Sequence, residues 1–266
     1  MIKKFIFYLV LALVLLSYYL LKLLINSVSY PGDYMAFLNV GMGDAILVKS
    51  RGEFMLIDGG PSSYSSNKMY KYTFTKKPIA YLSTHYHSDH ISGLIKALED
   101  TSNYDVFSNV QDNKTYQAKK LKNIVDDHSV KSLYTGDSFV FGNFTFSVLY
   151  PNLGCNSKNL NSCSIALLVK HSLGKSVLLL SDSEKESQDA YLHLVDDVDY
   201  IKVPHQGSDD SLNKALLKKA NPEYAVISVG ENTFGHPRQV VIDYYKKQGI
   251  KILRTDEEGD IIIYFK

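Results

Sequence analysis

The sequence predicts an α/β domain preceded by one apolar N-terminal helix. Three features predict this arrangement: an uncharged apolar run near the start, short apolar strands separated by glycine-containing turns, and helical segments between the strands. The length agrees, because residues 31–266 are long for an average domain but ordinary for a fold built on two sheets. We therefore expect a membrane anchor or signal segment at residues 1–30 and one folded domain at residues 31–266.

The N-terminal segment has the composition of a membrane anchor. Its 30 residues include three lysines and no acidic residue, and residues 5–21 form an uncharged run at the short end of what spans a bilayer. Lys3 and Lys4 precede the run, which favours a cytoplasmic N-terminus and an extracytoplasmic domain. A cleaved signal peptide is the alternative, because small residues at 27–29 have cleavage spacing, but the apolar run exceeds the usual signal core. We expect a single-pass cell-membrane protein held through residues 5–25, or a secreted one if the segment is cleaved.

Strand and helix patterns then alternate to the end of the chain. The predicted strands are 34–40, 45–49, 54–58, 81–84, 144–150, 165–171, 175–181, 200–203, 224–229, 251–254 and 260–265. The predicted helices are 92–98, 114–125, 184–194, 210–219 and 238–247. Residues 61–77 are rich in Ser, Tyr and Lys and fit either a substrate-facing loop or a disordered insertion.

Four metal-binding side chains lie within six residues. They are His85, His87, Asp89 and His90. Imidazole nitrogen and carboxylate oxygen suit zinc, manganese or iron, and no thiolate lies nearby to form a structural zinc cage. The cluster lies between a predicted strand and a predicted helix, on a loop where alternate side chains can converge. His85 and His87 can share one ion while Asp89 and His90 reach a second, as in metal-assisted hydrolysis. A histidine-rich surface loop is the alternative.

The H-x-H-x-D-H pattern resembles the metallo-β-lactamase superfamily. Further motifs, in the same order, resemble the hydrolase domain of ComEC-type DNA-uptake proteins; they occupy residues 37–48, 54–60, 177–182, 203–208, 227–232, 235–237 and 253–261. The resemblance implies a four-layer αββα sandwich with two divalent ions, zinc or manganese, at one edge between the sheets. It favours phosphodiester substrates, including DNA, over β-lactams, and it implies no organic cofactor.

The resemblance also assigns the distant ligands. Asp182 ends a predicted strand, where the superfamily places the carboxylate that bridges both metals; a helix N-cap is its other reading. His205 follows the next strand and would complete the second metal's shell. Asp58 and Asp44 would support the metal loop from behind rather than bind metal.

Several positions depart from the family pattern. The family usually has Asp at Asn39, Gln at Met42, Gly at Ser181 and His at Gln206. Ser181 requires either an ordinary backbone conformation or tolerated strain.

The third histidine of the first metal is also missing. Residues 161–164 stand in its place, so Asn161, Ser164 or water would approach that ion, and we expect a weaker first site. The unassigned His128, His171 and His193 are expected to be solvated.

The mechanism we expect is hydrolysis by a hydroxide shared between two ions. Asp89 would orient the nucleophile, and Ser208, His236 and Asn161 would contact substrate. His236 in Phe-Gly-His-Pro fits a proton donor or phosphate contact, or alternatively a turn stabiliser.

Charge and cysteine content bear on partners and location. Without the three lysines of residues 1–30, the chain has 26 basic and 28 acidic residues. This balance argues against electrostatic binding of a long stretch of nucleic acid. Cys155 and Cys163 lie in one loop, and an extracytoplasmic location favours a disulfide between them.

Three functions follow. The first is a membrane-tethered phosphodiesterase or nuclease, and the second is a hydrolase of another ester, lactone or amide on the same fold. The third is a non-catalytic accessory module of a DNA-uptake system. Partner proteins are not indicated.

Overall fold

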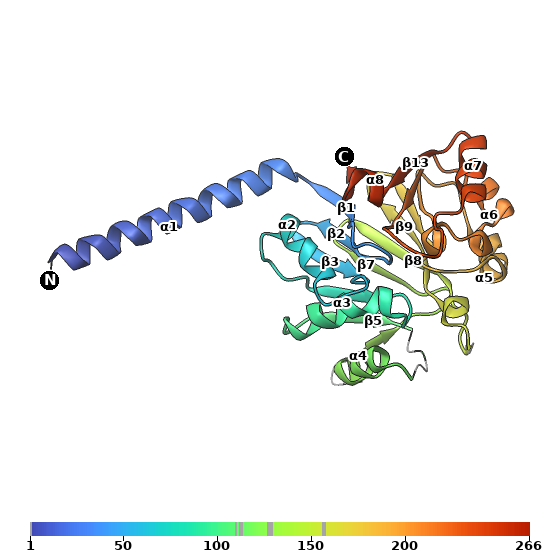
Figure 1. Cartoon of the computed structure of the whole chain (residues 1–266), viewed down its shortest axis with the longest axis horizontal. Helices are drawn as coiled ribbons and strands as arrows, with labels where there is room; N and C mark the ends of the chain where they lie inside the picture. The colour runs from blue at the N-terminus through green and yellow to red at the C-terminus, as the bar shows by residue number, and fades with distance from the viewer. Residues whose placement is uncertain (1, 110, 112–113, 127–129, 156–157) are drawn as a thin grey trace.

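Two seven-stranded sheets face each other at the centre of the fold (Figure 1). The computed structural model describes residues 2–109, 111, 114–126, 130–155 and 158–266. The first sheet has the order β14-β1-β2-β3-β4-β5-β6. Its strands are β1 (Asp33–Phe37), β2 (Ile46–Ser50), β3 (Glu53–Ile57), β4 (Ala80–Ser83), β5 (Asp105–Ser108), β6 (Val130–Ser132) and β14 (Ile261–Phe265).

The second sheet has the order β13-β12-β11-β10-β9-β8-β7. Its strands are β7 (Ser138–Phe141), β8 (Phe144–Tyr150), β9 (Ala166–His171), β10 (Ser176–Leu179), β11 (Tyr200–Lys202), β12 (Tyr224–Ile227) and β13 (Lys251–Arg254). In both sheets one half is antiparallel and the other parallel, with the parallel halves running β3-β4-β5-β6 and β10-β11-β12-β13.

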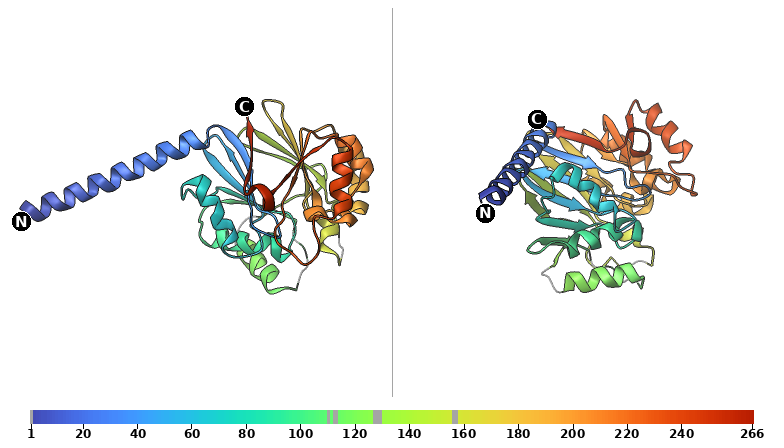
Figure 2. Two further views of the ribbon diagram at one scale, coloured as in Figure 1. Left: turned by 45° about the horizontal axis from the view of Figure 1, so that its top comes forward. Right: turned by 60° about the vertical axis from the view of Figure 1, so that its left-hand side comes forward.

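Helices form the crossovers that parallel strands need, and they cover the outer faces of the sheets (Figure 2). On the first sheet these are α2 (Tyr70–Thr73), α3 (Ser88–Glu99) and α4 (Tyr116–Asp126); on the second they are α5 (Lys185–Tyr191), α6 (Lys214–Ala220) and α7 (Gln239–Lys247). The short helices are α8 (Thr255–Glu258) and the 3-10 turns η1 (Ser65–Met69), η2 (Leu160–Cys163), η3 (Leu192–Leu194), η4 (Pro204–Gly207) and η5 (Asp209–Ser211). The four-layer αββα sandwich is confirmed.

Side-chain alternation along the strands separates the cores. In β1, Met35 and Phe37 enter the core between the sheets, whereas Tyr34 and Ala36 face the helices of the first sheet. The second sheet likewise buries Leu178 against α5, α6 and α7. Because both faces of each sheet are covered, the strands are apolar almost throughout. These uninterrupted apolar runs are what allowed the strands to be predicted from the sequence.

The N-terminal helix α1 (Ile2–Ser29) projects away from the sandwich (Figure 1). Its segment Lys4–Leu21 is long and apolar enough to cross a membrane, and none of that segment is buried against the rest of the chain. Length and composition alone would also fit a signal sequence.

The predicted elements agree with the structure except at a few places. Every predicted strand is present, but β5, β6 and β7 were not predicted because they are short and, in β6 and β7, largely exposed at the sheet edges. The helix predicted at 92–98 begins earlier, at Ser88, so Asp89 and His90 lie in its first turn and not on a loop. Residues 61–77 are not a disordered insertion, since they contain η1 and α2.

The unassigned histidines differ from the expectation in one case. His171 is buried, not solvated. Its Nε2 lies 3.1 Å from Asp33 Oδ2, at the start of β1, which gives the buried ring a polar partner. His193 is exposed, as expected, and His128 lies outside the described residues.

The disulfide between Cys155 and Cys163 is present, with the two Cα atoms 6.0 Å apart. It closes the loop that carries η2. The expected pairing is therefore confirmed.

Candidate metal centre

The parallel strands of both sheets end at one edge of the sandwich, and the predicted metal-binding residues gather there. His85 follows β4, Asp182 follows β10, and His205 follows β11 in the turn η4. Parallel strands place their carboxyl ends together, so residues distant in sequence meet at this edge. The site therefore draws on both sheets.

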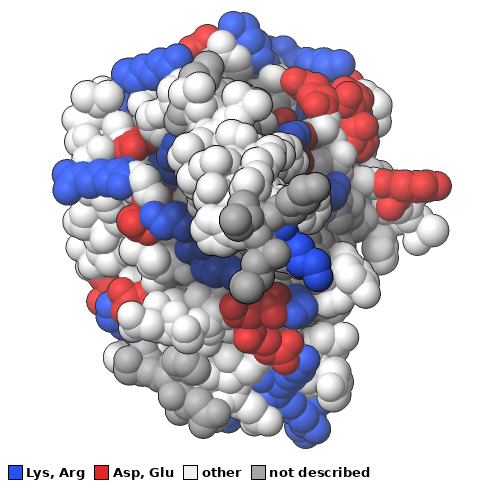
Figure 3. All heavy atoms as spheres, turned by 90° about the vertical axis from the view of Figure 1, so that its left-hand side faces the viewer, with Lys and Arg blue, Asp and Glu red and all other residues white. Residues whose placement is uncertain are grey.

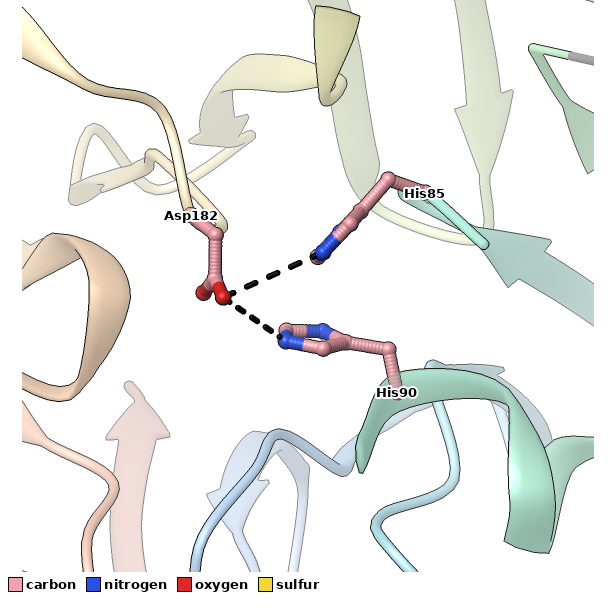
Figure 4. Close-up of side chains that lie close together, drawn as sticks. All are labelled: His85, His90 and Asp182. Carbon is pink, nitrogen blue, oxygen red and sulfur yellow. Dashed lines mark ion pairs between the residues drawn. The ribbon is translucent and has the colours of Figure 1, made fainter. Parts of the chain in front are cut away.

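Asp182 lies at the centre of the cluster (Figure 4). Its Oδ2 is 3.2 Å from His90 Nε2, 3.8 Å from His85 Nε2 and 3.9 Å from His205 Nε2. Two ligand atoms on one tetrahedral zinc ion are about 3.4 Å apart, given bonds of about 2.1 Å. These spacings are therefore those of groups that can share metal ions, and His85, His90 and Asp182 offer ligand atoms that all lie within 4.8 Å of one another.

The other two members of the H-x-H-x-D-H pattern lie at the rim. His87 Nδ1 is 3.1 Å from His85 Nε2, and Asp89 Oδ2 is 3.6 Å from His90 Nε2. His85 and His90 are completely buried, whereas His87 and Asp89 remain partly exposed. The pattern thus extends from the interior to solvent.

Burial and charge act strongly on these groups. Burial tends to raise the pKa of Asp182, but the neighbouring His90, His85 and His205 outweigh it and hold that pKa well below its usual range. Burial, aided by His90, lowers the pKa of His85 well below its usual value, so His85 is neutral and can offer a lone pair. Burial opposes protonation of His90, but Asp182, Asp89 and Asp58 together raise its pKa well above the usual value.

Asp58 fixes the orientation of His90 from behind. Its Oδ2 is 2.8 Å from His90 Nδ1 and accepts a hydrogen bond of 2.6 Å from the Thr84 hydroxyl, while Oδ1 accepts the Thr84 N–H at 2.9 Å. A ring that donates from Nδ1 keeps the lone pair of Nε2 for a metal. Burial raises the pKa of Asp58, and His90 and Thr84 oppose that rise.

Strained backbone accompanies the ligands. Asp58, Ser181, His205 and Gln206 are non-glycine residues with φ between 48° and 54°. Ser181, where the family usually has Gly, therefore takes the strained alternative, and its hydroxyl donates to Thr84 Oγ1 at 2.7 Å. The Gln206 amide donates to Asp182 Oδ1 at 3.3 Å.

Of the two residues expected in place of the missing third histidine, Asn161 is the better candidate ligand. It is buried, it lines the same cavity as His87 and Asp182, and its Oδ1 has no hydrogen-bond partner among the described residues. Ser164 instead donates its hydroxyl to the Asn161 carbonyl. Asn161 Oδ1 is thus the free acceptor at that position.

A cavity of about 390 Å³ opens over the cluster. Its lining residues are Met42, Pro61, His87, Ser88, Asp89, Asn161, Asp182, His205, Gln206, Phe234 and His236. Ser208 is not among them; it is buried, and its N–H donates to the His205 carbonyl.

His236 stabilises a turn, as one of its two expected roles requires, and it also lines the cavity. Its backbone N–H and carbonyl bond the Asn232 side chain and stabilise a turn, while its ring lines the cavity. Burial, then the nearby His205 and Arg238, lower the pKa of His236, which keeps the ring neutral at neutral pH.

A buried ion pair behind the site was not predicted. Lys202 at the end of β11 and Asp44 in the loop between β1 and β2 are both almost inaccessible and pair with each other. Asp44 also lies within 4.8 Å of Asp58 and His90, which supports its expected place behind the metal loop. A lysine at the end of a short buried strand was the available signal.

Comparison with known proteins agrees with this geometry. Residues 38–106 match the metallo-beta-lactamase superfamily. ComE operon protein 3 of Bacillus subtilis (strain 168) is 26% identical, over 86% of this chain and 32% of that protein. Recombination protein 2 of Haemophilus influenzae is 25% identical, over 91% of this chain and 30% of that protein.

The chain contains a metallo-β-lactamase domain, and over most of its length it is similar to ComEC-type proteins. It spans about a third of the length of the curated relatives it matches. The superfamily comprises metal-dependent hydrolases, and the residues described above offer the His and Asp ligands that its divalent metals require.

Solved structures share the fold of this metallo-β-lactamase domain. YhfI from Bacillus subtilis superposes with a TM-score of 0.60 at 15% identity, covering 87% of this chain and 99% of that one. CmlA, a diiron β-hydroxylase from Streptomyces venezuelae, has a TM-score of 0.61 at 14% identity, covering 88% of this chain and 54% of that one.

Proposed function

We propose that the chain is a membrane-anchored, extracytoplasmic phosphodiesterase or nuclease that uses two divalent metal ions. One observation carries the proposal: the Asp182 carboxylate lies among three imidazoles on the floor of an open cavity. Residues 1–30, with α1, would hold the protein in the membrane, and residues 31–266 would form the catalytic domain.

The described side chains divide into two ligand sets around Asp182. His85, His87 and the Asn161 amide oxygen would hold the first ion. Asp89, His90 and His205 would hold the second, with Asp182 shared between both. When bound, two such ions lower the pKa of a water between them and neutralise charge on the attacked phosphoryl group.

The chain's own residues would orient the reactants. Asp89 faces the cavity and can accept a hydrogen bond from the attacking water, which fixes its direction of approach. The neutral ring of His236 can donate a hydrogen bond to a non-bridging oxygen or to the leaving group. Ser208 would act only by bracing the His205 turn.

A phosphodiester substrate fits the charge of the molecule. On the face from which α1 projects, basic and acidic side chains are interspersed (Figure 3), and Lys71 and Lys76 are paired with Asp260 and Glu53. Among the residues that the structure describes, this face therefore offers no continuous basic track for a long nucleic acid. The names of the relatives, which include a competence protein and a recombination protein, favour DNA as the source of those phosphates.

A non-catalytic accessory module is the second candidate. Two observations favour it: Asn161 stands where an imidazole is usual, and the Gln206 amide donates to Asp182 Oδ1. Both changes would weaken metal binding without removing it. Metal content therefore separates the two functions.

The test uses the full chain in detergent, with metal content and hydrolysis of bis-p-nitrophenyl phosphate measured together. We expect close to two ions per chain and turnover that is lost in the Asp89→Ala, His90→Ala double variant. His193→Ala, which removes an exposed histidine away from the site, is the matched control and should keep both. Asn161→His should raise occupancy of the first ion. No metal and no turnover in the folded wild type, offered zinc and manganese, would exclude the enzyme and leave the accessory module.

A further inference from the structure

One wall of the cavity is apolar, although the metal-binding side chains form its floor. Met42, Pro61 and Phe234 line this wall. Phe234 leaves 65% of its surface exposed. Single exposed apolar residues are ordinary on protein surfaces, but apolar groups grouped at a pocket mouth beside convergent polar groups are typical of ligand contact.

The Phe234 ring is presented by a fixed turn. The Asn232 side chain donates to the carbonyls of Gly230 and His236 at 2.8 Å and accepts the His236 N–H at 3.0 Å. The Phe234 ring lies almost parallel to the His236 ring, with an interplanar angle of 16° and centroids 6.0 Å apart. The exposed face of Phe234 therefore lies beside a ring that lines the cavity.

Close backbone packing connects this turn to the metal loop. A Cβ added to Gly230 would lie 2.5 Å from Gly41 Cα, and one added to Gly43 would lie 2.1 Å from the Asp89 carbonyl oxygen. The loop that carries Met42 is thus packed between the Phe234 turn and Asp89. The apolar wall and the metal-binding floor hold a fixed distance from each other.

We propose that this wall, Phe234 with Met42 and Pro61, is a base-stacking subsite that holds one nucleobase next to the phosphate to be hydrolysed. The inference rests on the proposed function, whose substrate class it narrows to nucleic acid strands with an unpaired base at the site. Aromatic stacking tolerates any base, because every base has a π-face. A single stacked base would supply affinity that the chain's nearly balanced charge does not.

Binding separates this inference from catalysis. The probes are two fluorescein-labelled tetramers with hydrolysis-resistant phosphorothioate links, one of thymidines and one of abasic sugars, bound to the full chain in detergent and followed by anisotropy. The wild type should prefer the thymidine tetramer, and Phe234→Ala should reduce that preference by about 5- to 150-fold, the range that loss of one stacked base causes. Phe234→Tyr should keep the preference, as should Tyr116→Ala, which removes another exposed aromatic ring away from the cavity.

Equal binding of the two tetramers by the wild type, no binding of either, or a preference that survives in Phe234→Ala would overturn the subsite. A preference that depends on Phe234 without any hydrolysis of phosphodiesters would sustain the subsite and contradict the proposed function. Hydrolysis of phosphodiesters without a base preference would sustain the proposed function and contradict the subsite.

Discussion

Replacing Asp58 by Asn tests whether the orientation of His90 controls metal binding. The substitution keeps the size of the side chain and the acceptor for the Thr84 N–H. The amide NH₂ would then replace the oxygen that faces His90 Nδ1 at 2.8 Å. Because two donors cannot face each other, His90 would move its proton from Nδ1 to Nε2, and Nε2 would lose the lone pair that a metal needs.

The expected magnitude follows from the contact that is lost. A hydrogen bond to a charged group contributes about 1.5–3 kcal/mol, and about 1.4 kcal/mol corresponds to a factor of ten. The second ion, which His90 would bind, should therefore be held about 10- to 100-fold more weakly in Asp58→Asn. The first ion, which His85 and His87 would hold under the proposed function, should change much less.

Competition with a chromophoric chelator, for zinc and for manganese, measures both affinities. Asp33→Asn is the matched control, because Asp33 is also a poorly accessible carboxylate that contacts a histidine ring, here His171 Nε2 at 3.1 Å, but far from the cavity. Urea unfolding of both variants separates loss of metal from loss of fold. Two ions bound with wild-type affinity by folded Asp58→Asn would refute the role of the His90 tautomer.

Three further outcomes concern stability, and urea or thermal unfolding measures each of them. Burial opposes ionisation of Asp33, but hydrogen bonds from its neighbours outweigh burial and lower its pKa. The ionised carboxylate therefore stabilises the fold fully above the pKa that Asp33 has in the unfolded chain, and this stabilisation is lost as the pH falls through the lowered pKa of the folded protein. Asp33→Asn should cost about 1–3 kcal/mol at neutral pH, and this difference should shrink below about pH 4; a constant difference would contradict the assignment. Lys202→Met should cost about 3–5 kcal/mol because it leaves the Asp44 charge buried and unpaired, and adding Asp44→Leu should recover most of that loss. Replacing Cys155 and Cys163 by Ser should cost about 2–3 kcal/mol, the amount expected for so short a loop, and an unchanged melting temperature would show that the disulfide adds nothing.

The fold was predictable from the sequence wherever strands are buried on both faces. The strand at β10, Ser176–Leu179, is apolar along its length because sheets and helices cover it, so composition alone marks it. The edge strand β7 fails the same test, since solvent on one side allows residues such as Val140 to be exposed. The hydrophobic pattern of a segment therefore predicts the central strands of the sandwich better than its edge strands.

The candidate site was predictable where its residues are neighbours in sequence. Four of its residues, His85, His87, Asp89 and His90, fall within six consecutive positions, so their types alone indicate that they bind one ligand together. The pairing of Asp44 with Lys202 joins the two sheets, and no local pattern connects residues so far apart. Similarly, the burial of His171 depends on Asp33, which another strand supplies.

The departures from the family pattern acquire a physical meaning only in the folded protein. Ser181 in place of Gly keeps a backbone conformation with φ of 50°, which costs about 1–3 kcal/mol for a residue with a Cβ. Its hydroxyl, which Gly lacks, donates to Thr84, and Thr84 in turn donates to Asp58. This relay joins the end of β10 to the ends of β4 and β3, the places from which Asp182, His85 and the support of His90 arise. The strain at Ser181 is thus offset by a contact that ties the ends of β10 and β4, one from each sheet, together at the metal-binding edge.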